Sequence, residues 1–253
     1  MTRGYPWRQF AILVGAGLLG GVAVIPYQLA LLPQILERIP LPLVIASGLI
    51  NSLILLAFAV GVGLAAARAV GLRAPVSEAL AYGGDAIGAA RSLGIASAFG
   101  VGAVSALVVI VLDLLFFRRE AQELAGAIAS RPERWQGLLA SLYGGITEEL
   151  LTRLLLVSVL AWVLGRVWRG RDDRPASGAF VAAIVGAAAL FGAGHLPATA
   201  ALAPLTSALV LRAILLNGIV GVACGWLYWR RGLESAMVAH FAADIVLHVI
   251  AGG

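Results

Sequence analysis

The sequence contains one cysteine, Cys224, and few charged residues, which make up 12% of the chain. A single cysteine excludes an intrachain disulfide and a cysteine-based metal site. Soluble proteins carry about 25% charged residues, so the low charge argues against a soluble domain. The hydrophobic share of 61% and the mean hydropathy of +0.97 indicate instead a chain that crosses a membrane several times.

Lysine is absent, so all 18 basic residues are arginines, and the chain has a net charge of +5. The arginines fall mostly between apolar segments and form no compact patch with interleaved aromatic residues, so nucleic-acid binding is not indicated. A cytoplasmic amino terminus would place most of them inside, as the positive-inside rule expects. Arg118, Arg119, Arg131 and Arg134 oppose this assignment, so the orientation stays open.

Seven apolar stretches are long enough to cross a bilayer, which takes about 20 residues of helix. They are residues 10–32, 43–70, 94–117, 135–167, 178–195, 204–229 and 233–253. We expect an all-α, multi-pass transmembrane helical bundle of about seven spans, within a range of six to eight, as one membrane domain over residues 1–253. Residues 75–93 are too polar to span, and residues 118–134 are expected to form an amphipathic helix at the membrane interface.

Glu148, Glu149 and Arg153 lie within an apolar stretch that covers residues 138–160. Each charge costs about 2.5–3.5 kcal/mol near the middle of a membrane helix, so the cluster needs a reason. Glu149 and Arg153 are four residues apart and share a helix face, whereas Glu148 points about 100° away. One carboxylate can therefore pair with the arginine while the other stays free to take a proton from water. A buried ion pair that only fixes helix packing is the alternative, but it leaves Glu148 without a partner.

Histidines occur in two later spans. His195 closes the segment Phe-Gly-Ala-Gly-His-Leu-Pro, in which Pro197 is expected to end the helix before a loop at residues 196–203. His240 and Asp244 are four residues apart and share a face. A histidine and a carboxylate at this spacing can hold one metal ion or one substrate group together. Taken singly, each of these features is explained equally well by helix packing.

The remaining polar residues within the spans have simpler interpretations. Asp113 and Arg212 could pair with each other or extend to the interface. His248 continues the stripe of His240 and Asp244 by one more turn and is a further candidate ligand. The many alanine and glycine residues are explained by close packing of helices in lipid.

The ordered set of polar motifs is more specific than any single one. Glu-Glu-x-x-x-Arg, Phe-x-x-x-His and His-x-x-x-Asp follow one another on separate predicted spans. In this order they resemble the three motifs of the CAAX-protease and bacteriocin-processing (CPBP) family of intramembrane proteases. The resemblance covers about residues 138–249, which would be the catalytic core, and residues 1–100 show no matching motif.

The resemblance implies hydrolysis of a peptide bond inside a membrane cavity. Glu148 and His195 would activate the water molecule, and Glu149 and Arg153 would orient the site. The cavity is expected to open toward the segments at residues 118–134 and 196–203, because both glutamate and histidine spans approach that side of the membrane.

The resemblance also implies that His240 and the residue four positions later stabilise the oxyanion. That residue is often asparagine in the family, but it is Asp244 here. Asparagine always has a hydrogen bond to donate, whereas aspartate donates only when protonated. Asp244 is therefore either held neutral by burial or has another function.

Metal binding is the other function considered for Asp244. Two imidazoles and two carboxylates are an acceptable donor set for Zn²⁺ with one position open to water. The sequence has no His-Glu-x-x-His motif, so a metal-free glutamate protease remains the alternative. The expected metal ligands are Glu148, His195, His240 and Asp244.

The expected function is thus an intramembrane endopeptidase whose partners are a peptide or membrane-protein substrate and the lipid bilayer. The alternatives are a non-catalytic immunity or scaffold protein of the same fold and a small proton-coupled transporter. The arginine-only, alanine- and glycine-rich composition is typical of a GC-rich bacterium, so the plasma membrane is the expected location. The sequence leaves the oligomeric state open.

Overall fold

The computed structural model describes residues 4–128, 130–170 and 174–252. These residues are almost entirely helical, and the only strand-like pairing among them is one bridge between Arg169 and Pro175. The helices are α1 (Trp7–Ala23), α2 (Ile25–Leu31), α3 (Ile35–Arg38), α4 (Leu41–Val70), α5 (Pro75–Tyr82), α6 (Ala86–Ser92), α7 (Ile95–Phe116), α8 (Arg118–Ala127), α9 (Arg134–Leu142), η1 (Tyr143–Glu148), η2 (Leu150–Val157), α10 (Ser158–Val167), α11 (Ser177–Gly194), α12 (Leu196–Leu202), α13 (Ser207–Arg231), α14 (Leu233–Asp244) and η4 (Ile245–Ile250).

Seven helical stretches in the described part of the chain are long and apolar enough to cross a membrane. They are Trp7–Leu31, Leu41–Val70, Ile95–Phe116, Arg134–Val167, Ser177–Leu202, Ser207–Arg231 and Leu233–Ile250. Each one corresponds to a predicted span. The prediction of an all-α, multi-pass membrane bundle is therefore confirmed.

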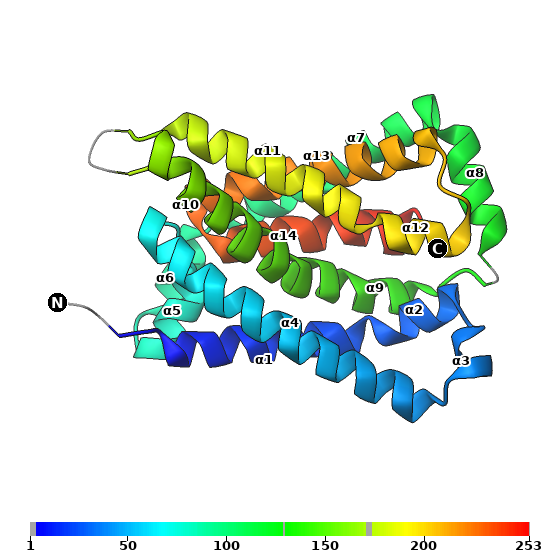
Figure 1. The fold of residues 1–253 in the computed structure, drawn as a ribbon, viewed down its shortest axis with the longest axis horizontal. Helices are drawn as coiled ribbons and strands as arrows, with labels where there is room; N and C mark the ends of the chain where they lie inside the picture. The colour runs from blue at the N-terminus through cyan, green and yellow to red at the C-terminus, as the bar shows by residue number, and fades with distance from the viewer. Residues whose placement is uncertain (1–3, 129, 171–173, 253) are drawn as a thin grey trace.

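Figure 1 shows these spans running along the long axis of the molecule in alternating directions. The short helices α5 and α6 lie at the end of the bundle where the chain begins, so residues 75–93 do not span. At the opposite end, α8 crosses the bundle axis beside α12 (Figure 1). This is the position expected for an interfacial helix, although α8 ends at Ala127 and residues 131–133 are not helical.

Proline residues divide two of the predicted spans without ending them. The first span bends at Val24, and Pro26 stands in the first turn of α2. Pro197 stands in the first turn of α12, which continues the fifth span to Leu202. The prediction of a loop at residues 196–203 is wrong, because proline lacks only an N–H that the first turn of a helix leaves unpaired.

The helices approach closely where small side chains face one another. Ala98 and Ala106 of α7 and Ala236, Ala239 and Ala243 of α14 are fully buried. A Cβ atom at Gly102 would overlap the backbone oxygen of Ala239, so only glycine allows this contact between α7 and α14. The close packing places α14, which carries His240 and Asp244, in the interior of the bundle.

Asp113 of α7 and Arg212 of α13 also join two spans. Nε of Arg212 donates to Oδ1 of Asp113 and Nη2 donates to Oδ2, both at 2.7 Å. Of the two expectations for this pair, mutual pairing is the one the structure shows.

Candidate active site

The fourth span changes from α-helix to π-helix at the predicted site. The π-helical segments η1 and η2 run from Tyr143 to Glu148 and from Leu150 to Val157. A π-helical turn holds one residue more than an α-helical turn, and such turns are frequent at functional sites. The wider turn alters the directions in which neighbouring side chains point.

Glu149 forms a buried ion pair with Arg153, as their spacing predicted. Nη1 of Arg153 lies 2.9 Å from Oε1 of Glu149, and the two side chains are 2% and 0% exposed. Nη2 of Arg153 donates to the backbone oxygen of Gly221 at 3.0 Å, and its guanidinium lies 5.1 Å from the ring centre of Phe191. The arginine is thus held by α13 and α11 as well as by its own helix.

His240 is linked to the same carboxylate. Its Nδ1 lies 2.7 Å from Oε1 of Glu149, and the side chain is 4% exposed. An ionised carboxylate only accepts hydrogen bonds, so Nδ1 carries the proton. Nε2 of His240 then faces Oε2 of Glu148 at 3.6 Å. The Glu149 carboxylate therefore orients the imidazole toward Glu148.

His195 approaches Glu148 from another helix. It occupies the junction of α11 and α12, where Nδ1 lies 2.9 Å from the backbone oxygen of Phe191. A carbonyl oxygen only accepts, so this proton is also on Nδ1. Nε2 of His195 lies 4.0 Å from Oε1 of Glu148. The Phe191 ring contacts both imidazoles edge to face, at 4.8 Å from His195 and 5.5 Å from His240.

Glu148 is therefore the free carboxylate of the pair. Its side chain is 20% exposed, and its two oxygens face Nε2 of His195 and Nε2 of His240. Both separations exceed a hydrogen-bond length, so neither imidazole forms a direct hydrogen bond with the Glu148 carboxylate. A water molecule between them could contact Glu148 and His195 at once.

Asp244 completes the cluster on the side of α14. Its Oδ1 lies 3.8 Å from Nε2 of His240 and 3.8 Å from Nε2 of His248. Its Oδ2 packs so closely on Gly144 that a Cβ atom there would overlap it. Glycine at this position of η1 lets Asp244 and His240 approach the helix that carries Glu148.

The structure thus brings all the predicted site residues into one cluster. These residues are Glu148, Glu149, Arg153, His195, His240 and Asp244. Sequence reasoning missed Gly144, and it missed Tyr27, whose hydroxyl lies 3.2 Å from Nδ1 of His248. Spacing along one helix could reveal neither, because both contacts join segments far apart in the sequence.

The predicted metal ligands form a chain of close pairs. The separations are 4.0 Å for His195 and Glu148, 3.6 Å for Glu148 and His240, and 3.8 Å for His240 and Asp244. Ligand atoms around tetrahedral Zn²⁺ lie about 3.3 Å apart. No three of these four described residues have ligand atoms that all lie within 4.8 Å of one another, so the side chains would have to rearrange to hold one ion. Both imidazoles present Nε2 to Glu148 while Nδ1 is hydrogen-bonded, the arrangement usual for histidine ligands.

A different set of residues brings its possible metal-ligand atoms closer together than the predicted ligands do. In the described part of the chain, Glu149, Cys224 and His240 are the one set of three whose ligand atoms all lie within 4.8 Å of one another. The guanidinium of Arg153 already contacts the Glu149 carboxylate there, so the site has its own cation. The donor chemistry therefore favours a structural assignment for this group, and the predicted ligands remain a prediction.

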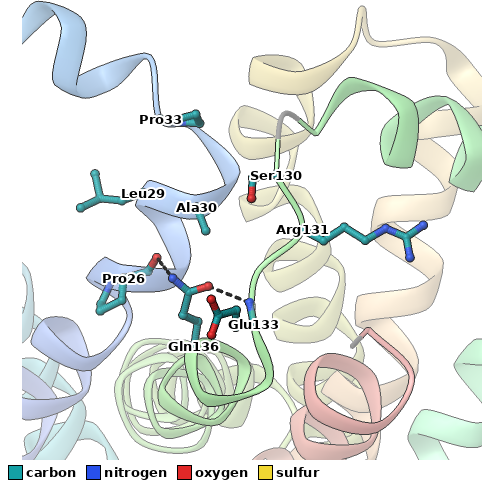
Figure 2. Close-up of a pocket in the computed structure, with 8 residues that line it drawn as sticks. All are labelled: Pro26, Leu29, Ala30, Pro33, Ser130, Arg131, Glu133 and Gln136. Atoms are coloured by element: carbon teal, nitrogen blue, oxygen red, sulfur yellow. Dashed lines mark hydrogen bonds between the residues drawn. The ribbon is translucent and has the colours of Figure 1, made fainter.

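A pocket of about 430 Å³ lies at the end of the bundle toward which the site was expected to open. The pocket lies between α2 and the segment that precedes α9 (Figure 2). Nε2 of Gln136 donates to the backbone oxygen of Pro26 at 3.2 Å, and Oε1 accepts from the backbone N–H of Glu133 at 2.7 Å. The residues lining it are Pro26, Leu29, Ala30, Pro33, Ser130, Arg131, Glu133 and Gln136.

Residues 130–246 match the model of a protein family, described as type II CAAX prenyl endopeptidase Rce1-like. The matched segment includes every residue of the predicted site, from Glu148 to Asp244. No curated protein and no solved structure matches the chain. The family and the seven apolar helices together indicate a multi-pass membrane protein with the general activity of a CAAX-type endopeptidase. Residues 130–246 are thus similar to the Rce1-like type II CAAX prenyl endopeptidases, in agreement with the predicted resemblance to the CPBP proteases.

Proposed function

We propose that the chain is an intramembrane endopeptidase that hydrolyses a peptide bond with water activated by Glu148 and His195. The observation that carries the proposal is the difference in burial and contacts between the two adjacent glutamates. Glu149 is fully buried and engaged by Arg153 and His240, whereas Glu148 is partly exposed and faces two imidazole nitrogens. A structural ion pair would require only the first of these carboxylates.

In the proposed reaction, Glu148 takes a proton from a water molecule that also contacts Nε2 of His195. The oxygen of that water forms a bond to the carbonyl carbon of the substrate, and the carbonyl oxygen becomes an oxyanion. Glu148 then returns the proton to the amide nitrogen as the carbon–nitrogen bond breaks. The second proton of the water stays on the attacking oxygen, so the products are a new carboxylic acid and a new amine, and atoms and charge balance.

His240 is suited to the oxyanion because of its contact with Glu149. A carboxylate on Nδ1 favours the imidazolium form, in which Nε2–H points toward the space between Glu148 and Asp244. A preorganised donor of this kind is worth about 10²–10³ in rate when it meets developing negative charge. Arg153 neutralises Glu149 in turn and keeps this arrangement in place.

A metal ion is part of the proposal as an alternative to the imidazolium. The residues that would hold it are Glu148, His195, His240 and Asp244. A bound Zn²⁺ would polarise the substrate carbonyl and lower the proton affinity of the attacking water. Glu149, Arg153 and Phe191 would have the same function with or without the metal ion. In both cases they orient the imidazoles of His195 and His240.

We further propose a peptide or membrane-protein segment as substrate, cleaved at the plasma membrane of a bacterium. The composition supports the bacterial setting, since every basic residue is arginine and 31 residues are glycine. In such a cell, a signal-like peptide, a toxin precursor or a membrane anchor has the required chemistry, namely an apolar peptide that can enter from the lipid.

The test is cleavage of a fluorogenic peptide library by purified protein in detergent. We expect Glu148→Gln to lower kcat/KM by about 10²–10⁴, the usual contribution of a general base, and His195→Ala to do the same. Glu78→Gln is the matched control, because it removes an exposed carboxylate of α5 that pairs with Arg73. Full cleavage by Glu148→Gln would overturn the proposal. Proton-coupled uptake or toxin binding by a protein that cleaves no peptide would favour the alternative functions.

A further inference from the structure

A third imidazole reaches the site from beyond the segment that matches the family. His248 lies in η4, one turn after Asp244, and its side chain is 36% exposed. Its Nε2 lies 3.8 Å from Oδ1 of Asp244, which is also the distance from Nε2 of His240 to the same oxygen. Oδ1 of Asp244 therefore lies between two imidazoles.

The first membrane span holds the other side of the His248 ring. The hydroxyl of Tyr27, in α2, lies 3.2 Å from Nδ1 of His248. The two rings meet edge to face, with centroids 5.4 Å apart and planes inclined by 65°. A Cβ atom at Gly137 would overlap the backbone oxygen of His248, so α9 packs directly on its backbone. The imidazole is thus held by α2, and the backbone of His248 is held by α9.

With Asp244 ionised, the contacts of His248 favour one position for its proton. A lone pair on Nε2 would face the Asp244 oxygen and repel it, whereas an N–H there is attracted. With the proton on Nε2, Nδ1 has a lone pair that accepts the O–H of Tyr27. The donors then run in one direction, from Tyr27 to His248 and from His248 toward Asp244.

We propose that Tyr27 and His248 are positioning residues that orient the Asp244 carboxylate in the active site. An ionised aspartate presents only acceptors, so it needs donors around it to keep a fixed orientation. An N–H on Nε2 of His248 faces Oδ1 across 3.8 Å, too far for a direct hydrogen bond but close enough to attract the carboxylate, and Gly144 leaves space for Oδ2. The role of these two residues rests on the proposed peptidase function, but their geometry can be tested without it.

The first test is nuclear magnetic resonance of the full chain with ¹⁵N-labelled histidine. The chain has 3 histidines, so His195→Gln, His240→Gln and His248→Gln variants assign every signal. We expect the His248 signal to show the Nε2-protonated tautomer and to move toward a mixture of tautomers in Tyr27→Phe. Tyr228→Phe is the matched control, because its hydroxyl contacts Ser158 instead. An Nδ1-protonated His248, or a signal that Tyr27→Phe leaves unchanged, would overturn the proposal even if the protein cleaves no peptide.

The second test is kinetic. We expect Tyr27→Phe and His248→Gln each to lower kcat about tenfold with little change in KM, the usual cost of losing an orienting partner. In an Asp244→Asn background the same substitutions should cost less than about twofold, because the amide is uncharged and has N–H donors of its own, so it depends less on an N–H from His248. Equal losses in both backgrounds would show that Tyr27 and His248 do not act through Asp244. Absence of cleavage by the unaltered protein would count against the proposed function alone.

Discussion

Glu149 and His240 are joined by a hydrogen bond of 2.7 Å, although they lie 91 residues apart in the sequence. The same Glu149 oxygen receives the guanidinium of Arg153 at 2.9 Å, so one fully buried carboxylate holds two partners. Its other oxygen, Oε2, has no hydrogen-bond partner within the described residues. Glu149 therefore joins the span that carries the glutamates to the span that carries His240 and Asp244.

Removal of one member of the buried pair should destabilise the protein. We expect Glu149→Leu to lower the free energy of unfolding by about 3–5 kcal/mol, because it leaves Arg153 charged and unpaired. The double variant Glu149→Leu with Arg153→Met should recover most of that stability, since no unpaired charge remains. Thermal unfolding in detergent measures both effects. If the double variant recovers stability and also full cleavage, Glu149 does not orient His240.

Gly144 should be needed for activity more than for folding. Gly144→Ala places a Cβ atom on Oδ2 of Asp244, so this carboxylate must shift, whereas Nε2 of His240 is in van der Waals contact with that Cβ atom at 3.4 Å. Overpacking of this kind costs about 1–3 kcal/mol of stability. We also expect kcat/KM per folded molecule to fall below that of the unaltered protein. Gly100→Ala in α7 is the matched control, because nothing lies within 4 Å of a Cβ atom there. Equal kcat/KM values for the two variants would contradict the prediction.

The ion pair of Asp113 and Arg212 should stabilise the contact between α7 and α13. Hydrogen bonds to charged groups contribute about 1.5–3 kcal/mol, and the bidentate geometry favours the upper part of this range. We expect Asp113→Ala, Arg212→Ala and the double variant to show a coupling energy of that size in thermal unfolding. A coupling near zero would mean that each residue is solvated independently at the membrane surface.

Metal dependence gives a prediction that does not depend on the choice of substrate. In the metal-dependent version of the proposal, purified protein retains zinc through Glu148, His195, His240 and Asp244, and elemental analysis shows its loss in His240→Ala. Arg153→Met should retain more zinc than His240→Ala, because it removes an orienting residue and not a ligand. Active protein that contains no transition metal and resists chelators would identify a metal-free glutamate protease.

The apolar runs of the sequence were sufficient to predict the spans. Hydrophobic burial in lipid is local and additive, so the ends of α4, α7 and α13 fall within a few residues of expectation. The prediction failed at Pro197, where the same residue type can end one helix or begin the next. It also gave no sign of the π-helical segments, which depend on packing against neighbouring helices and not on local propensity.

The contacts of the candidate site also include some that the sequence predicted and some that it could not. The contact of Glu149 with Arg153 follows from a spacing of four residues, and so does the proximity of His240 and Asp244. The contact of Glu149 with His240, and that of Tyr27 with His248, could not be predicted, because no periodicity relates residues on different spans. The order of motifs predicted the candidate catalytic residues, but only the fold shows which carboxylate each histidine meets.

The packing of the first two spans on the fourth has a consequence for engineering the enzyme. Thr147 donates from η1 to the backbone oxygen of Gly17, and a Cβ atom at Gly63 of α4 would overlap the backbone of Leu154. The family-matched segment is therefore shaped by residues outside it, among them Gly17, which lies 130 positions before Thr147. Chimeras that graft residues 130–246 onto unrelated leading helices should insert into a bilayer yet lose their geometry around Glu148, whereas co-expression of the missing amino-terminal fragment should restore it in trans.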